Sequence, residues 1–426
     1  MQLVAYGAQD IYLTGNPQIT FFKVVYRRHT NFAVESIEQT FNGQADFNKR
    51  VTATISRNGD LIQQMYLEVE LPFVTANSLS TSNVWTYGVG NALVKQAEIE
   101  IGGQLIDRQY GDWMNIWSEL TVPAGKRDGY DDMVGNKLTA SNTDQLGGVA
   151  FVASCSKTRL YVPLQFWFNR NPGLALPLIA LQYHEVKLNL ELRASADLLN
   201  VSGTLPTIVG SLGCKLYVDY IYLDTDERRR FAQVSHEYLI EQVQFTGAES
   251  IGSSIGSKNV TLNFNHPVKE LVWAHVSSTH ATTGVLATSC KWFNYSGVDS
   301  GAGVDSFTTA LLQLNGHDRF SVRQADYFRK VQNYEHHTRV PRTGGDLNVA
   351  TTDPKAARRQ YIYTYSFALS PEEHQPSGTC NFSRIDNAVL QLGYSGSNPA
   401  MSLNVYAVNY NVLRIMSGMG GLAYSN

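Results

Sequence analysis

The chain has few cysteines, few charges and no long hydrophobic run. Its four cysteines are dispersed over 426 residues without a C-x-x-C pair, so no zinc or thioredoxin-like motif is present. Such sparse cysteine usage is typical of a protein that folds in a reducing compartment. Charged residues make up 17% of the chain and the net charge is -3, without the basic excess typical of nucleic-acid binding. We therefore predict no direct nucleic-acid contact.

No segment predicts export or a membrane span. The first ten residues lack a basic n-region and a long apolar h-region, and Asp10 interrupts them. The longest apolar stretch, Leu174 to Leu181, contains Pro177 and is far shorter than the ~20 residues that a spanning helix needs. We expect neither a signal peptide nor a transmembrane helix.

Motifs that carry catalysis or bind metals are also missing. The sequence contains no G-x-x-x-x-G-K-[ST], no H-E-x-x-H and no G-x-S-x-G. The glycine-rich segment Gly418–Leu422 follows the last predicted strand with no helix behind it, so we interpret it as a flexible tail. His336 and His337 are adjacent and would point to opposite faces of a strand, which prevents them from sharing a metal. We predict no catalytic residue, no cofactor and no metal site.

Aromatic residues and alternating patterns are what the chain does have. It holds 23 tyrosines and 18 phenylalanines, residue types that favour β-strands. Hydrophobic and polar residues alternate around Ile99, and again from Val186 to Leu192. A period of two with one polar face indicates half-buried antiparallel strands.

The sequence repeats itself in order at a spacing of about half its length. Four segments of the first half are echoed in the second: Ile37–Gly43 by Ile240–Gly247, Ile99–Gly103 by Leu312–Gly316, Leu160–Phe166 by Tyr361–Phe367, and Leu216–Tyr220 by Val405–Tyr410. A long period kept in order predicts two copies of one domain rather than a solenoid of short repeats.

Each half contains eight predicted strands. They span 34–41, 50–56, 61–71, 93–101, 104–109, 159–166, 184–193 and 214–223, then 238–245, 259–264, 268–277, 307–314, 317–322, 361–368, 385–394 and 402–410. Eight antiparallel strands in two sheets is the count of a jelly roll, although other β-sandwiches have similar numbers. The predicted fold is all-β, with two consecutive eight-stranded antiparallel jelly-roll domains. The predicted divisions are an arm (1–26), a first jelly roll (27–223), a linker (224–236), a second jelly roll (237–412) and a C-terminal tail (413–426).

Two long loops recur at matching places in the two halves, at 73–92 and 278–306, and at 111–157 and 323–360. Loops of this length in a compact domain are usually functional or face a partner. The segment 111–117 predicts a short helix with buried tryptophans. Of the four N-x-[ST] sequons, at Asn200, Asn259, Asn294 and Asn381, we select Asn294 as the glycosylation candidate because it lies in a long loop.

Several long segments resemble the major capsid proteins of large icosahedral nucleocytoplasmic DNA viruses. They are Leu3–Asp10, Tyr12–Lys23, Pro172–Val186, Pro376–Asn387 and Leu413–Leu422. The chain is most similar to the phycodnavirus type that infects chlorella algae. The resemblance covers both ends and all strand regions, whereas the long loops depart from the family pattern.

The resemblance implies a structural role in the virion. It implies a double jelly roll, a homotrimeric, pseudo-hexagonal capsomer and an icosahedral shell over an internal viral membrane, assembled in the host cytoplasm. Neighbouring capsomers, minor capsid proteins beneath the shell and a penton protein are the implied partners. Glycans in that family are added outside the secretory route and need not occupy sequons, which weakens the case for Asn294.

Two other classes of protein stay open on the residues alone: a nonviral structural β protein, and a β-sandwich that binds or cleaves carbohydrate. A β-sandwich can also bind or cleave carbohydrate, and two carboxylates roughly 5–10 Å apart would carry the cleavage. The sequence does not place any two carboxylates across a cleft. We further expect the arm to be poorly ordered by itself and to become ordered beneath the capsomer, against neighbours or minor proteins.

Overall fold

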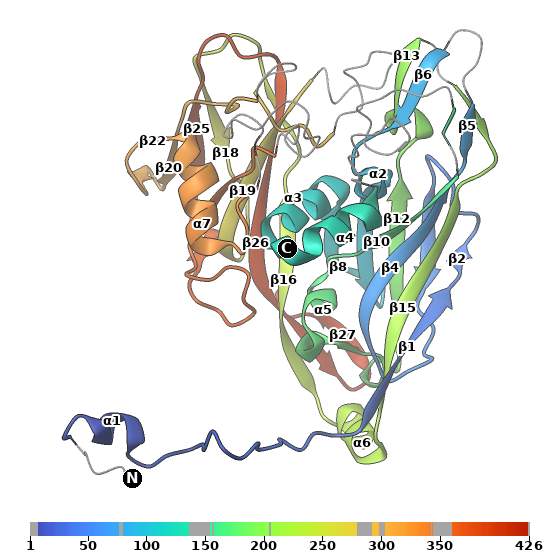
Figure 1. Ribbon diagram of the computed structural model, residues 1–426, viewed down its shortest axis with the longest axis vertical. Helices are drawn as coiled ribbons and strands as arrows, with labels where there is room; N and C mark the ends of the chain where they lie inside the picture. Colours follow the sequence, from blue (N-terminus) through green and yellow to red (C-terminus); the bar gives the residue numbers. More distant parts are fainter. Residues whose placement is uncertain are drawn as a thin grey trace.

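The protein consists of two β-rich lobes that lie side by side, with an N-terminal arm that leaves their base (Figure 1). The computed structural model describes residues 7–75, 80–135, 154–155, 157–203, 206–278, 292–297, 303–341, 343 and 360–424. No helix within these ranges is long and apolar enough to cross a bilayer. The arm carries one short helix, α1 (Asp10–Thr14).

The first lobe is built from two antiparallel sheets. One has the order β1 (Phe32–Gln39), β15 (Gly213–Leu223), β4 (Leu61–Leu71) and β10 (Thr158–Pro163), with β11 (Leu176–Pro177) also on β4. The other has the order β2 (Phe41–Asn42), β3 (Arg50–Thr54), β12 (Val186–Leu192), β7 (Val94–Ile101) and β8 (Gln104–Tyr110).

The second lobe repeats this plan. One sheet has the order β16 (His236–Phe245), β26 (Met401–Met416), β19 (Pro267–Ser277) and β23 (Tyr363–Ser366); β17 (Glu249–Ile251) and β27 (Met419–Leu422) add to β26, and β24 (Cys380–Asn381) to β19. The other has the order β18 (Ser257–Thr261), β25 (Ala388–Gly393), β20 (Thr309–Leu314) and β21 (His317–Asp318), with β22 (Arg323–Gln324) on β20.

The two lobes have the same strand order. Numbering the eight predicted strands of each half in sequence, both lobes pair them as 1-8-3-6 in one sheet and 2-7-4-5 in the other. Two four-stranded sheets of eight antiparallel strands connected in this way form a jelly roll. The predicted double jelly roll is confirmed, and the sequence echoes are the equivalent strands of its two copies.

Equivalent turns keep the same backbone geometry in both lobes. The β7–β8 hairpin turns at Gly102 and Gly103, with φ of 60° and 83°, and the β20–β21 hairpin turns at Asn315 and Gly316, with φ of 52° and 79°. Positive φ at both central residues is the type I′ turn that matches the twist of paired strands, and glycine and asparagine are the residues that tolerate it. The predicted strand at 317–322 is wrong beyond Asp318, because the chain bends away and Arg319 N donates back to Leu312 O.

The long insertions carry helices and two small sheets. The predicted helix with buried tryptophans is confirmed as α3 (Gly111–Thr121), in which Trp113 and Trp117 are buried. Other elements outside the jelly-roll sheets include α2 (Val89–Leu93), α4 (Ala124–Val134), α5 (Trp167–Arg170), a π-helical turn (Tyr327–Val331) that continues into α7 (Gln332–His336), the pair β6 (Ser80–Trp85) and β13 (Leu199–Gly203), and the triple β14 (Thr207–Val209), β5 (Phe73–Thr75) and β9 (Ser154–Cys155). Figure 1 places β6 and β13 at the end of the molecule opposite the arm.

The linker and the C-terminal segment are ordered. Helix α6 (Thr225–Gln233) fills most of the predicted linker, and Asp224 caps its N-terminus by accepting from Thr225 N. Strand β26 continues past residue 412 and turns into β27. The interpretation of Gly418–Leu422 as a flexible tail is wrong. A Cβ at Gly420 would lie 2.6 Å from Leu181, so the glycine permits close packing of this hairpin on the first lobe.

Candidate functional site

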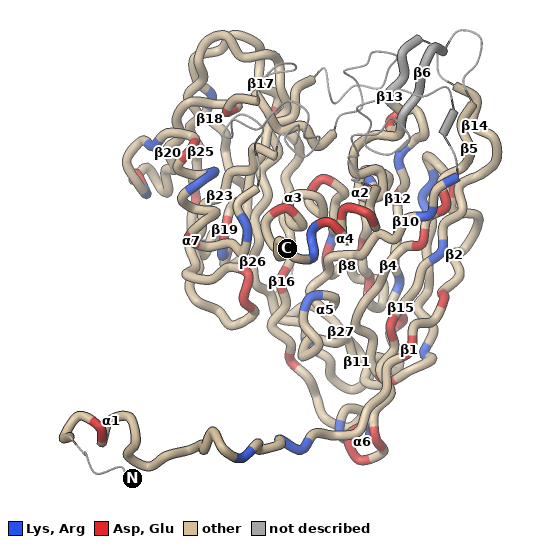
Figure 2. Tube along the Cα trace, viewed as in Figure 1, with Lys and Arg blue, Asp and Glu red and all other residues tan. Residues whose placement is uncertain are grey.

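The main ion-pair and hydrogen-bond clusters of this protein are buried, and most of them connect the two lobes. Within the described ranges, no group of three or more histidine, cysteine, aspartate or glutamate side chains is arranged to hold a metal ion. In the view of Figure 2, acidic and basic residues are interspersed along the described parts of both lobes.

One buried pair has the hydrogen bond that a hydrolase nucleophile uses. Ser306 Oγ lies 2.8 Å from His275 Nδ1. The other ring nitrogen of His275 lies 3.0 Å from Tyr394 Oη rather than near a carboxylate that would orient a catalytic base. Burial lowers the pKa of His275 to about 3. His275 has no exposed surface and Ser306 has 4%, so substrate cannot reach Oγ and the pair serves packing.

An ion-pair cluster connects helix α3 of the first lobe to the second lobe. Glu119 is fully buried and its Oε1 lies 2.5 Å from Arg127 Nη2, which also lies 2.8 Å from Asp131 Oδ1. The other carboxylate oxygen of Glu119 pairs with Arg339, which follows α7 in the second lobe. The backbone N–H of Arg339 donates to Leu120 O at 3.0 Å. One carboxylate therefore holds a guanidinium from each lobe.

A second buried cluster crosses the junction nearer its base. Arg170, at the end of α5 in the first lobe, lies 3.0 Å from Glu241 on β16 of the second lobe. Lys269 on β19 is fully buried and pairs with the other oxygen of Glu241 at 2.8 Å. The guanidinium of Arg170 stacks over Trp117 with its carbon 4.3 Å from the ring centroid, a favourable cation–π contact. The charges thus satisfy one another across the junction instead of facing solvent.

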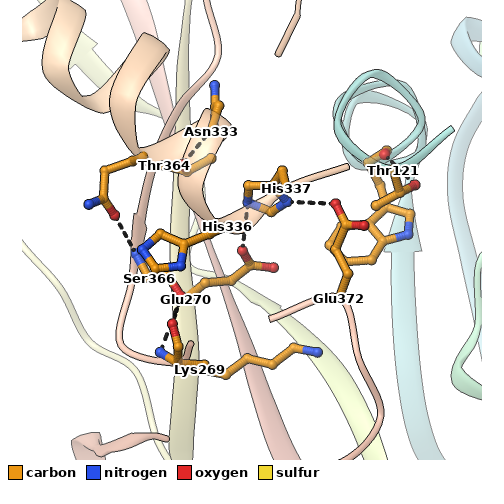
Figure 3. Close-up of polar contacts among 12 residues, drawn as sticks. Thr121, Lys269, Glu270, Asn333, His336, His337, Thr364, Ser366 and Glu372 are labelled. Atoms are coloured by element: carbon orange, nitrogen blue, oxygen red, sulfur yellow. Dashed lines mark hydrogen bonds and ion pairs between the residues drawn. The ribbon is translucent and has the colours of Figure 1, made fainter. Parts of the chain in front are cut away.

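His337 bridges two carboxylates inside the second lobe (Figure 3). Its Nε2 lies 3.1 Å from Glu270 Oε2 and its Nδ1 lies 2.9 Å from Glu372 Oε1. Burial alone disfavours the imidazolium, but Glu270 and then Glu372 outweigh that effect and raise the pKa of His337 to about 9. Burial likewise opposes ionisation of Glu270, and His337 outweighs it and lowers the pKa of Glu270. The histidine is a buried cation that joins β19 to the loop at 372.

The edge strand β8 of the first lobe meets the edge strand β16 of the second. Gln242 Nε2 donates to Ile106 O, and Val243 N donates to Asp107 Oδ1 at 3.2 Å. Asp107 also accepts from Gln109 Nε2 at 2.9 Å. Burial raises the pKa of Asp107 to about 6, against the lowering effect of these hydrogen bonds. These side chains cover the free edges of the two sheets, where another strand could otherwise pair.

Asp107→Asn is expected to stabilise the protein at neutral pH. The pKa of Asp107 is higher in the folded state than the unfolded value of 3.8, so stability is lost as pH rises from about 4 to 6, and ~3 kcal/mol of burial cost remains above pH 6. Asparagine keeps a carbonyl oxygen for Val243 N. Urea unfolding measures the difference in the free energy of unfolding between variant and wild type. From pH 4 to pH 7.5 this difference should shift by about 2–3 kcal/mol in favour of the variant. Asp318→Asn, a change at an exposed site, is the control. Its free energy of unfolding should stay within about 0.5 kcal/mol of the wild type at both pH values. If the two variants showed the same pH dependence, this account of Asp107 would be contradicted.

The candidate residues from the sequence are Asn294, His336 and His337, and they lie in different parts of the second lobe. Asn294 is half-buried between Phe293 and Tyr295, which are buried, and its Oδ1 accepts from Ser296 N at 3.2 Å. Glycosylation of Asn294 stays a prediction. His336 and His337 do not lie on a strand: His336 is the last residue of α7 and His337 follows it. Their separation is confirmed: His336 Nδ1 lies 3.0 Å from Leu369 O, whereas His337 turns to Glu270.

Sequence reasoning missed the buried clusters, although two signals pointed to them. Glu119 lies in a helix whose other residues from Trp113 to Leu120 are buried, and an ionised residue in such a helix requires a partner. The run Val268–Ala274 holds Lys269 and Glu270 among apolar residues, and both side chains are fully buried.

Comparisons with known proteins identify the family. The family described as "Major capsid protein N-terminus" matches residues 20–224, and the family described as "Large eukaryotic DNA virus major capsid protein" matches residues 227–421. The chain is 56% identical to the major capsid protein of Pyramimonas orientalis virus, over 100% of this chain and 99% of that protein. It is 44% identical to the major capsid protein of Paramecium bursaria Chlorella virus 1, with the same coverage of both chains.

Solved structures agree with this assignment. The crystal structure of VP54 of the chlorella virus PBCV-1 has a TM-score of 0.75 and 39% identity, covering 96% of this chain and 100% of that one. The major capsid protein of Faustovirus has a TM-score of 0.77 over 96% of this chain and 94% of that one, at 13% identity, which supports the fold alone. The predicted resemblance is confirmed, and with it the prediction that the protein is structural and not an enzyme. The chain belongs to the major capsid proteins of large eukaryotic DNA viruses, and its place is the capsid of the virion.

Proposed function

We propose that three copies of the chain form a pseudo-hexagonal capsomer that tiles an icosahedral shell over an internal membrane. The observation that carries this proposal is the presence of two jelly rolls of equal strand order in one chain. A three-fold ring of such chains presents six similar lobes around its axis, and closed rings are a common way to satisfy heterologous contacts. Six-neighbour packing of such units covers a nearly flat face.

The junction between the lobes supports this role. One hydrophobic core extends through both lobes, and Trp113 of α3 packs against Tyr406 of β26 with ring centroids 5.3 Å apart. Together with the ion pairs of Glu119 and Glu241, this contact fixes the angle between the lobes. A building block of a closed shell needs a fixed angle, because errors at each subunit accumulate around the lattice.

The further parts of the proposal concern partners and divisions of the chain. Residues 27–223 and 237–412 form the two lobes that alternate around the capsomer, joined through 224–236. The insertions at the end opposite the arm face outward, and Asn294 is the proposed glycan site. The base contacts minor capsid proteins, and vacancies at the five-fold positions are filled by a separate penton protein. Assembly takes place in the host cytoplasm.

Native mass measurement tests the proposed capsomer. Purified protein should have three times the 47.3 kDa mass of the chain, and negative-stain images should show six-lobed particles. A chain that stays monomeric at micromolar concentration under non-dissociating conditions would count against the proposal. A stable oligomer of known subunit number, run in the same buffer, controls for dissociation by the instrument.

A further inference from the structure

The N-terminal arm exposes its large apolar residues without covering them against its own lobes. Phe22, Tyr12, Phe21, Leu13 and Tyr26 are all at least 85% exposed. The hydrogen bonds seen within residues 7–31 join the arm to itself, as between Gly7 N and Asp10 Oδ2 or Gly15 N and Ile11 O. Exposed apolar surface that gathers on one segment marks an interaction site.

A pocket of about 460 Å³ opens at the base of the molecule. It lies where three parts of the chain converge: the end of α6 with Val234, the first-lobe loop with Tyr183, and the β26–β27 turn with Met416. The exposed fraction is 75% for Tyr183, 52% for Val234 and 48% for Met416. None of the described residues that line the pocket carries a formal charge.

The arm offers one segment that, like the described lining of the pocket, carries no charged residue. Residues 11–22 contain no charged residue, whereas Lys23, Arg27 and Arg28 follow them. An uncharged pocket accepts an uncharged segment without the cost of desolvating a charge. Phe21 and Phe22 end this segment, and their burial in a pocket would remove two large apolar side chains from water.

The direction of the arm favours the pocket of another copy. Figure 1 shows the arm leaving the base beside α6 and continuing clear of both lobes. An extended chain of 25 residues spans about 80 Å, enough to cross to a neighbour. Resting on the capsomer proposed above, we infer that residues 11–22 of one copy occupy the basal pocket of a second copy of this chain. Each copy then gives one arm and receives one, as a heterologous ring requires.

Photo-crosslinking between distinguishable copies tests this inference. A chain with Phe22→p-benzoylphenylalanine is co-expressed with an affinity-tagged chain that lacks the probe, and the assembled protein is irradiated. We expect a covalent product between the two kinds of chain, with peptides of the arm joined to peptides containing Tyr183, Val234 or Met416. The matched control carries the probe at Leu369, which is 76% exposed on the second lobe, and should give no product in the pocket.

A pocket variant makes the test specific. Val234→Asp on the tagged chain places a carboxylate in the pocket at a half-exposed position and should lower the cross-link yield about tenfold or more, corresponding to 1.4 kcal/mol or more of binding. Native mass is measured on the same sample. A trimer whose arm cross-links only within its own chain, or outside the pocket, overturns the inference and leaves the capsomer intact; a monomer overturns both. Flotation of the arm with phosphatidylserine vesicles in place of the cross-link would assign it to a membrane and overturn the inference too.

Discussion

Glu119→Ala is expected to lower the free energy of unfolding by about 3–5 kcal/mol. Removal of one member of a buried ion cluster leaves the opposite charges buried without their counter-charge. Glu119 is fully buried and holds Arg127 of its own lobe and Arg339 of the other. Two guanidiniums would thus lose a shared carboxylate, and the cavity left by the side chain adds to the loss. Urea unfolding followed by tryptophan fluorescence measures the change at fixed protein concentration, since association of copies adds to apparent stability.

The same variant should separate the lobes before they unfold. Glu119 pairs α3 with Arg339 of the second lobe, so the loss of this pair weakens the junction more than either sheet. We expect one unfolding transition for the wild type and two for the variant. Lys215→Ala is the matched control, because it removes half of an ion pair with Glu38 in which both side chains are about half exposed; surface pairs contribute only about 0–1 kcal/mol. If Glu119→Ala cost no more than Lys215→Ala, the cluster would not hold the lobes together.

The strands and their duplication could be predicted because both depend on local pattern. Alternation around Ile99 indicates β7, and the echo at Leu312 indicates β20, since each residue lies on the face its hydrophobicity requires. Turn residues such as Gly102–Gly103 and Asn315–Gly316 then set the register of each hairpin. Both the alternation and the turn residues are local in the sequence: they lie within a few residues of the strand or turn that they predict.

The junction could not be predicted because its partners are distant in the chain. Glu119 and Arg339 are separated by 220 residues, and no local pattern indicates that they meet. Gly418–Leu422 looked flexible for the same reason: its packing surface at Leu181 belongs to the other lobe. The sequence places His337 in the long loop at 323–360, whereas it directly follows α7, a short helix whose Gln332 and Asn333 side chains hydrogen-bond to β23.

His337→Gln is expected to destabilise the protein most at acidic to neutral pH and least in alkaline solution. The folded-state pKa of about 9 lies above the ordinary value of 6.5. The stability gained from the imidazolium is therefore fully present below pH 6.5 and is lost as pH rises through 9, a change of up to ~3 kcal/mol. Glutamine can still donate one hydrogen bond to a carboxylate, but it carries no charge to offset the burial of Glu270.

The measurement is the difference in the free energy of unfolding between wild type and variant at pH 6.5, 7.5, 8.5 and 9.5. Titrating groups that do not contact His337 affect both proteins alike, so the difference reports His337 together with its partners Glu270 and Glu372. We expect about 3 kcal/mol at pH 6.5, falling steadily toward pH 9.5. Tyr334→Phe, an exposed change on α7, should give no difference up to pH 8.5. A difference for His337→Gln that stays constant across this range would mean that the ring is neutral when buried, and that Glu270 is balanced by Lys269 instead.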